Sequence, residues 1–189
     1  MEHTYWQKQI PSKPLFPNIE WSKPERRDQA GKLAIVGGNK LGFAAVAENY
    51  QLALETGIGQ ARVLLPDCLK NTVPPTLVDV IFAACTSSGG LSREATPELR
   101  AVSDWADGVL LIGDAGRNAE TALVYEQFLQ DYDGPVTVTR DAIDLIKNNP
   151  RLLAERSSTI LVASFAQLQK LFQGVYYPKV LTFNMQLLQ

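Results

Sequence analysis

The chain has 189 residues, of which 46% are hydrophobic and 20% charged, and its formal net charge is −2 at pH 7. This length predicts one domain that buries about 70% of the surface exposed by the unfolded chain, and the slightly acidic balance argues against a broad nucleic-acid-binding surface. No run approaches the roughly 20 apolar residues of a membrane span. The N-terminal sequence MEHTYWQKQIPSKP lacks the apolar core of a secretion signal. We therefore expect a cytoplasmic protein without nucleic-acid or membrane partners.

The sequence contains one histidine, His3. A Ser-His-Asp triad, a Cys-His pair and the common zinc sites are therefore disfavoured. Cys68 and Cys85 lie near apolar runs and fit no metal-ligand spacing, so we interpret them as reduced packing residues, with a redox role as the alternative. No metal site is predicted, and any chemistry must depend on carboxylates, backbone amides, lysine, arginine or a bound cofactor.

The first 31 residues are rich in proline and contain Trp6, Trp21 and the charged run KPERRD. Proline at this density disfavours regular secondary structure. We therefore predict an N-terminal arm over residues 1–31, whose tryptophans dock on the protein body or on a partner subunit. A ligand-binding role for these tryptophans is the alternative. Residues 32–189 are predicted to form one domain.

From residue 32 onward, aliphatic and β-branched runs alternate with segments whose apolar residues recur at helical spacing. The predicted strands are, in chain order, Lys32–Val36, Ala61–Leu65, Leu77–Ala83, Val109–Ile112, Pro135–Thr139 and Thr159–Val162. The predicted helices are 41–56, a helix capped by Thr96, a helix capped by Asn118, Asp141–Lys147 and Ser164–Phe172. Gly57-Ile58-Gly59 is expected to end the first helix. This alternation predicts an α/β fold with three layers: a mostly parallel sheet with helices on both faces.

Ligands of parallel sheets bind beyond the carboxyl ends of the strands. Four loops of unusual composition follow predicted strands, namely Gly37–Gly42, Gly113–Arg117, Thr139–Asp141 and Val162–Gln167. All four would lie at the same edge of a parallel sheet. We therefore predict the functional site at this edge.

The first of these loops has the sequence VGGNKLG. It is not a Walker P-loop, because Phe43 and Ala44 stand where the phosphate-binding lysine and the magnesium-binding hydroxyl would be. It is not a Rossmann fingerprint either, because its glycines read G-G-x-x-x-G. A glycine-rich turn before a helix is suited to an anion or to a polar ligand edge. A tight corner without a ligand is the alternative.

The second loop, GDAGR, again places glycines between a strand and a helix. Arg117 could hold a phosphate, and Asp114 could bind a ribose or a metal ion. The alternative is a surface ion pair between these two side chains, which would contribute little energy. Asp141 is interpreted as an N-cap in preference to a catalytic acid, and Asp144 as a solvated surface group.

Four segments together resemble a known family. They are GKLAIVGGNKLGFAAVAENYQLALETGIGQARVLLPD, ADGVLLIGDAGRNAET, PVTVTRDAIDLI and STILVASFAQLQKLF. In this order they resemble the strand-and-turn segments of the ATP- or ADP-dependent NAD(P)H-hydrate dehydratases, which belong to the ribokinase-like superfamily. The similarity extends from Gly31 to Phe172. It implies a ribokinase-like fold and an enzyme that removes water from hydrated NADH or NADPH while hydrolysing ATP or ADP with Mg²⁺.

The resemblance also implies roles for individual residues. The substrate side would be lined by Gly37, Gly38, Asn39 and Gly42. The dinucleotide would be approached by Gly113, Asp114, Gly116 and Arg117, and Asp141 would match the second acid of the family's DADAL segment. The nucleotide-side loop would contain Ser164 and Gln167.

The sequence also departs from the family pattern. GDAGR stands in place of GPGLG, Thr139 replaces the first acid of DADAL, and Ser164–Gln167 replace the family's HPGE. The glycine-rich segment that carries the family's catalytic aspartate would lie beyond Gln189, so the domain is expected to be truncated. Two alternatives stay open: an inactive relative that binds a nucleotide or dinucleotide, and a small-molecule, sugar-type kinase. An exposed sheet edge would favour a homo-oligomer.

Overall fold

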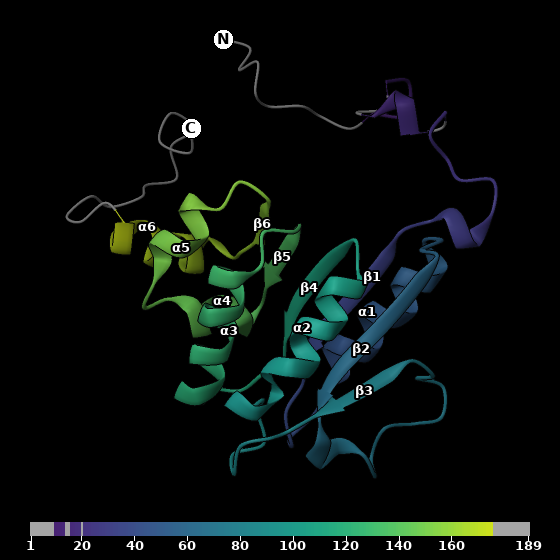
Figure 1. Ribbon diagram of the computed structural model, residues 1–189. Helices are drawn as coiled ribbons and strands as arrows, with labels where there is room; N and C mark the ends of the chain where they lie inside the picture. Colours follow the sequence, from purple (N-terminus) through teal and green to yellow (C-terminus); the bar gives the residue numbers. More distant parts are fainter. Residues whose placement is uncertain (1–9, 14–15, 20, 176–189) are drawn as a thin grey trace.

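The computed structural model describes residues 10–13, 16–19 and 21–175, which form a six-stranded sheet flanked by helices (Figure 1). The strands are β1 (Lys32–Gly37), β2 (Gln60–Pro66), β3 (Val80–Ala83), β4 (Gly108–Gly113), β5 (Val136–Thr139) and β6 (Thr159–Val162). Every neighbouring pair is parallel, and the order across the sheet is β3-β2-β1-β4-β5-β6. The predicted α/β fold is confirmed.

The helices are α1 (Ala44–Glu55), α2 (Thr96–Trp105), α3 (Ala119–Asp131), α4 (Asp141–Ile146), α5 (Pro150–Glu155) and α6 (Phe165–Val175). Short 3-10 turns occupy Pro17–Ile19, Arg27–Gln29, Asp67–Leu69 and Arg93–Ala95. The sequence does not predict α5, because this helix has six residues and buries one of them, Leu153. Within the described ranges, no helix combines the length and apolar character needed to cross a membrane.

The helix ends follow the predicted signals with one exception. Gly57 has a φ of 91°, and Ile58 N donates to Ala53 O at 3.1 Å, which ends α1 as predicted. The Asn118 side chain accepts hydrogen bonds from the second and third amides of α3, so this cap is confirmed. The Thr96 cap is wrong. The 3-10 turn runs directly into α2, and the Thr96 hydroxyl donates to Arg93 O at 2.7 Å.

The third predicted strand is too long at its start. β3 begins at Val80, and Leu77 precedes it in a turn in which Leu77 N donates to Pro74 O at 3.1 Å. Leu77 is nevertheless buried in the core. Leu77 is apolar because it packs in the core and not because it belongs to a strand. The apolar run of the sequence is therefore longer than β3.

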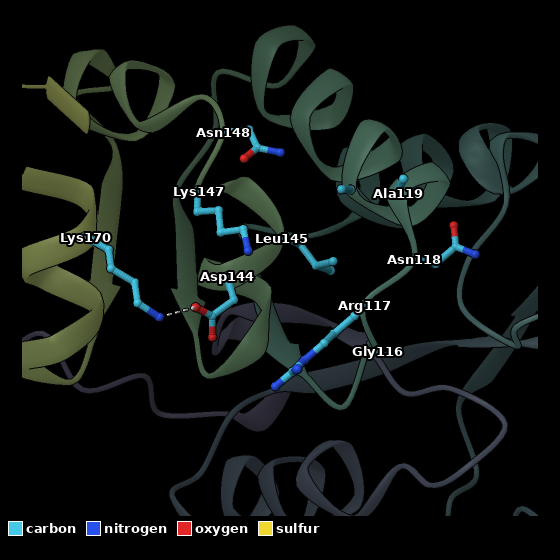
Figure 2. Close-up of a pocket in the computed structure, with 10 residues that line it drawn as sticks. Gly116, Arg117, Asn118, Ala119, Asp144, Leu145, Lys147, Asn148 and Lys170 are labelled. Atoms are coloured by element: carbon cyan, nitrogen blue, oxygen red, sulfur yellow. Dashed lines mark ion pairs between the residues drawn. The ribbon is translucent and has the colours of Figure 1, made fainter. Parts of the chain in front are cut away.

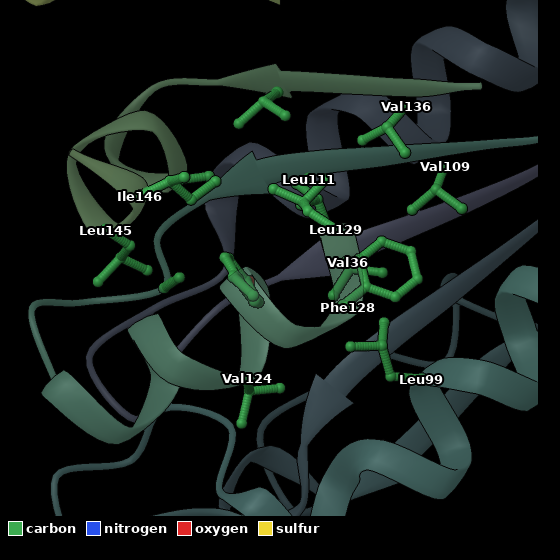
Figure 3. Packing of buried hydrophobic residues seen from close by; sticks show 14 of the residues in the cluster. Val36, Leu99, Val109, Leu111, Val124, Phe128, Leu129, Val136, Leu145 and Ile146 are labelled. Carbon is green, nitrogen blue, oxygen red and sulfur yellow. The ribbon is translucent and has the colours of Figure 1, made fainter. Parts of the chain in front are cut away.

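Two apolar layers hold the helices on opposite faces of the sheet. On one face, α1 packs Val46 and Tyr50 against β1 and β2. On the other face, α2, α3 and α4 pack against the central strands, where Leu99 and Phe128 lie close to Val109 (Figure 3). The residues of each strand alternate between the two layers, as expected for a sheet covered on both sides.

The face of the sheet on which α1 packs is less completely covered at β6, the edge strand farthest from β3. The strand register places Ile35, Leu110, Thr137 and Ile160 in one row across β1, β4, β5 and β6. Ile35 is fully buried beneath α1, whereas Ile160 is 64% exposed. The described residues therefore leave the α1 face open at β6.

The N-terminal arm meets the domain at its last residues. Arg27 Nε donates to Gly59 O at 3.3 Å, beside the start of β2. Trp21 is 91% exposed, so it does not dock on the described protein body, and its docking on a partner subunit stays a prediction. A residue with so little contact contributes little burial energy. Trp6 lies outside the described residues.

Candidate functional site

Three loops meet beyond the carboxyl ends of β1, β3 and β4. We call them the first turn (residues 37–42), the serine loop (residues 86–90) and the second turn (residues 113–117). Lys40 N donates to Gly89 O at 3.1 Å, which joins the first turn to the serine loop. The Asn118 side-chain amide, just after the second turn, donates to Ser88 Oγ. The serine loop was not among the predicted site loops, although its TSSGG sequence after a strand is a turn signal.

The two leading glycines of the first turn are buried. A Cβ on Gly37 would lie 2.4 Å from the carbonyl oxygen of Gly113. Gly38 has a φ of 81°, and a Cβ there would lie 2.8 Å from the Leu65 side chain. These glycines allow β1, β4 and the turn to pack closely. They form a tight corner between the ends of β1, β2 and β4.

The remaining residues of the first turn shape its outer side. Asn39 is buried, its side-chain amide donates to Asp114 O, and its Oδ1 accepts from Leu41 N at 2.7 Å. The amide group therefore ties the first turn to the second turn. A Cβ on Gly42 would have no neighbour within 4 Å. This glycine is thus in open space, unlike Gly37.

Asp114 supports the neighbouring helix. Its Oδ2 accepts a hydrogen bond from Ala45 N at 2.8 Å, in the first turn of α1. Phe43, the residue before this helix, provides no side-chain cap. Asp114 therefore acts as the capping carboxylate from another loop. The ion pairs of the described residues do not include one between Asp114 and Arg117, so that alternative is wrong.

Asp141 organises the second turn from the start of α4. Its Oδ2 accepts from Gly116 N at 3.3 Å, and Arg140, with a φ of 56°, occupies the N-cap position in its place. A Cβ on Gly113 would lie 2.3 Å from Asp141 Oδ1, so this glycine makes room for the carboxylate. Burial raises the pKa of Asp141, and the amides of Gly116 and Asp114 offset part of that rise.

A cleft of about 370 Å³ opens beside the second turn (Figure 2). Its walls come from the second turn and α3 on one side and from α4, the residues after it and α6 on the other. The lining residues are Gly116, Arg117, Asn118, Ala119, Ala122, Asp144, Leu145, Lys147, Asn148 and Lys170. Two of the predicted site residues, Gly116 and Arg117, line this cleft. We call it the basic cleft, because three cations and one carboxylate surround it.

The charges of the basic cleft are unevenly paired. Lys170 Nζ lies 3.9 Å from Asp144 Oδ1, so these two residues form an ion pair. Arg117 and Lys147 take part in no ion pair among the described residues. Asp144 is therefore a member of the cleft, which corrects its interpretation as a solvated surface group. Lys147 and Lys170 were missed, because α4 and α6 bring them together from distant parts of the sequence.

Ser164 directly precedes α6, Gln167 lies in its first turn, and neither lines the basic cleft. Gln167 N donates to Ser164 Oγ at 3.3 Å, and Ser164 N donates to Gln167 Oε1 at 3.1 Å. These reciprocal bonds form a capping box. Gln167 Nε2 also donates to Asp144 Oδ2 at 3.1 Å. The pair therefore anchors the helix that carries Lys170.

A second, smaller cavity of about 320 Å³ lies on the other side of the second turn. It is lined by Asn39, Leu41, Ser88, Gly90, Ala115, Gly116, Arg117 and Asn118. It shares residues 116–118 with the basic cleft. The second turn thus separates two cavities at the edge where the sequence predicts a site.

The arrangement of strands, helices and edge loops is that of a ribokinase-like α/β fold. A ribokinase-like superfamily protein from Enterococcus faecalis V583 superposes on this chain with a TM-score of 0.64 and 16% sequence identity. The match covers 79% of this chain and 50% of the other, so this chain spans about half the length of that protein. At this identity the likeness establishes the fold alone.

No protein-family model matches the sequence, and no curated protein matches it. A second solved structure, the FMN-dependent cysteine decarboxylase SpaF, superposes with a TM-score of 0.42 and 14% identity, over 80% of this chain and 100% of the other. That score is too low to carry a structural argument. The first likeness therefore shows a ribokinase-like fold and nothing finer.

Proposed function

We propose that the basic cleft binds a phosphate-bearing ligand of the nucleotide or dinucleotide class. The observation that carries this proposal is the convergence of Arg117, Lys147 and Lys170 on one open cleft. Because the first two cations lack ion-pair partners among the described residues, their charges are available to an anion. Guanidinium and ammonium groups are the common partners of phosphate oxygens. The N-terminus of α3 at the cleft adds a favourable dipole.

A dinucleotide suits this edge better than a mononucleotide, because two cavities flank the same second turn. The basic cleft supplies positive charge, and the smaller cavity supplies the Asn39 amide, the Ser88 hydroxyl and backbone groups. Both volumes lie within or near the range of small-molecule sites, about 300–1,000 Å³. A ligand that spans the second turn would place its phosphates beside Arg117 and a polar ring in the smaller cavity.

Within this class we propose hydrated NADH or NADPH as the ligand and NAD(P)H-hydrate dehydratase as the activity. The support is the sequence resemblance, which keeps its order from β1 to α6. ATP or ADP, when bound, would supply the phosphoryl group that makes the hydrate's hydroxyl a leaving group. The described residues contain no cluster of three or more histidine, cysteine or acidic side chains for a metal. Mg²⁺ would therefore be carried by the phosphates of the bound ATP or ADP.

The carboxylates beside the second turn are engaged by other protein groups, which favours a binding role for the site over proton transfer. Asp141 accepts from Gly116 N and lies outside the cleft lining, and Asp144 is engaged by Lys170 and Gln167. A general base must reach the proton that it removes. Binding is consequently the first property to test.

The test is thermal unfolding with NADPH, NADPH hydrate, ADP and ATP, each with and without Mg²⁺. A ligand that binds only the folded state raises the melting temperature in proportion to the logarithm of its concentration above the Kd. We expect this rise for the dinucleotides in wild-type protein and its loss in the Arg117→Ala, Lys147→Ala double variant. Arg151→Ala is the matched control, because Arg151 is an exposed cation on α5 outside the cleft. Absence of a shift with every nucleotide would refute the proposal.

An activity assay then separates the candidate functions. Recovery of NADPH absorbance from its hydrate, in the presence of ATP or ADP, would support the dehydratase. A thermal shift without recovery would support the inactive binding relative. Consumption of ATP with a sugar or small alcohol, and not with the hydrate, would support a kinase.

A further inference from the structure

Cys68 and Cys85 lie side by side at the carboxyl ends of β2 and β3. The register pairs Pro66 with Ala83, so each cysteine follows its strand by two residues. Cys68 is close enough to Cys85 to affect the pKa of its thiol. Neighbouring strands lie about 4.8 Å apart, which falls within the Cα separation of roughly 4.4–6.8 Å that a disulfide spans. The register therefore brings both cysteines to the same edge of the sheet, after two neighbouring strands.

The two thiols have different surroundings. Cys68 is exposed and donates from Sγ to Gly89 O at 3.7 Å, so its interpretation as a packing residue is wrong. Cys85 is half-buried. A hydrogen bond to the Asp67 carboxylate, followed by burial, raises the pKa of Cys85 to about 11. Cys68 is thus the thiol that a solute can reach, and Cys85 is its protonated neighbour.

We propose that Cys68 and Cys85 form a dithiol that small disulfides, such as glutathione disulfide, oxidise to an intramolecular disulfide. The Cys68 thiolate attacks one sulfur of glutathione disulfide and releases one glutathione thiolate. Cys85 then loses its proton and attacks the Cys68 sulfur of the mixed disulfide, which releases the second glutathione. Two protein thiols are oxidised, one glutathione disulfide is reduced to two glutathiones, and the two thiol protons end on the released glutathiones.

Closure of this disulfide acts on the serine loop. In the reduced protein, Gly89 O accepts hydrogen bonds from Cys68 Sγ and from Lys40 N. Oxidation removes the thiol donor and leaves the carbonyl with the Lys40 amide. Ser88 and Gly90 of the same loop line the smaller cavity. The dithiol therefore lies where its oxidation changes a wall of that cavity.

The experiment treats the wild-type protein with glutathione disulfide at pH 8 and follows its intact mass and free thiols. We expect a monomer that has lost about 2 Da and both free thiols, and that dithiothreitol restores. Cys68→Ser and Cys85→Ser should each stop at one bound glutathione or none. A wild-type product that keeps a glutathione on Cys68, or that pairs cysteines between two chains, would overturn the proposal.

The Asp67 variant tests the role of the neighbouring carboxylate. Asp67→Asn removes the largest cause of the raised pKa of Cys85, so the second step should become roughly three- to tenfold faster at pH 8. Asp79→Asn is the matched control, since Asp79 is an exposed carboxylate just before β3. It should close at the wild-type rate. Equal rates in both variants and wild type would show that Asp67 does not hold the Cys85 proton, and would overturn this part of the mechanism.

Discussion

The two glycine-rich turns resemble each other in sequence and differ in structure. The first turn begins with a closed corner, in which Gly37 and Gly38 are buried against the ends of β2 and β4. The second turn carries Arg117 into an open cleft that Lys147 and Lys170 also reach. Glycines between a strand and a helix therefore do not define an anion site by themselves. Unpaired cations beside open space are the stronger indication.

The largest expected effect is on stability, and it comes from a substitution in the closed corner of the first turn. Gly37→Ala should lower the free energy of unfolding by about 3 kcal/mol, because the new Cβ meets the Gly113 carbonyl and the backbone has to shift. Urea unfolding followed by circular dichroism measures the change. Gly42→Ala in the same turn is the control, and should change stability by less than about 0.5 kcal/mol, since nothing lies near its Cβ. Equal effects at both positions would contradict the distinction between corner and open space.

The next largest effect is on ligand affinity, and it comes from a substitution in the second turn. Arg117→Ala should weaken dinucleotide binding about tenfold, or about 1.4 kcal/mol, because one phosphate partner is lost. Its stability should stay within about 0.5 kcal/mol of wild type, since Arg117 is exposed. Titration calorimetry measures the affinity. Lys40→Ala, in the first turn, should leave affinity unchanged, because Lys40 lines neither cavity. A greater loss from Lys40→Ala would reverse the roles given to the two turns.

A third prediction concerns the link between the turns. Asp114→Ala should destabilise the protein by about 1 kcal/mol, because α1 loses the carboxylate that accepts from Ala45 N. Asp114→Asn keeps an acceptor oxygen and should recover most of that loss. Denaturant midpoints of the two variants measure the difference. Equal stability of the alanine and asparagine variants would show that the capping bond contributes nothing.

Much of the fold follows from local sequence patterns. The aliphatic and β-branched runs predict all six strands, and the central ones are continuous apolar runs because they are covered on both faces. The caps at Asn118 and Gly57 are local signals, and both are present. The Ser164–Gln167 capping box also has a local pattern, a serine three residues before a glutamine, although it was not predicted. These bonds account for the positions of both side chains, and the ligand role implied by the resemblance stays a prediction.

The site was harder to predict, because it depends on long-range contacts. Lys147 and Lys170 meet Arg117 only after α4 and α6 have packed. Arg156 gives a second example. Its guanidinium donates to the carbonyl oxygens of Leu129 and Gly134 near the end of α3, at 2.6 and 2.9 Å. Neither arrangement has a short sequence motif, so residue spacing alone does not reveal it.

The smallest expected effect is the pH dependence that Asp141, which holds the second turn, gives to the free energy of unfolding. Burial raises its folded-state pKa above the unfolded value, so the folded protein holds this proton more tightly. The resulting stabilisation is complete below the unfolded pKa of about 3.9 and is lost as pH rises through the folded pKa. Asp141→Asn removes this titration. The free energy of unfolding of Asp141→Asn, relative to wild type, should therefore increase between pH 3 and pH 7 in urea titrations. A decrease over this range would mean that the Gly116 and Asp114 amides outweigh burial, and that the second turn needs a charged Asp141.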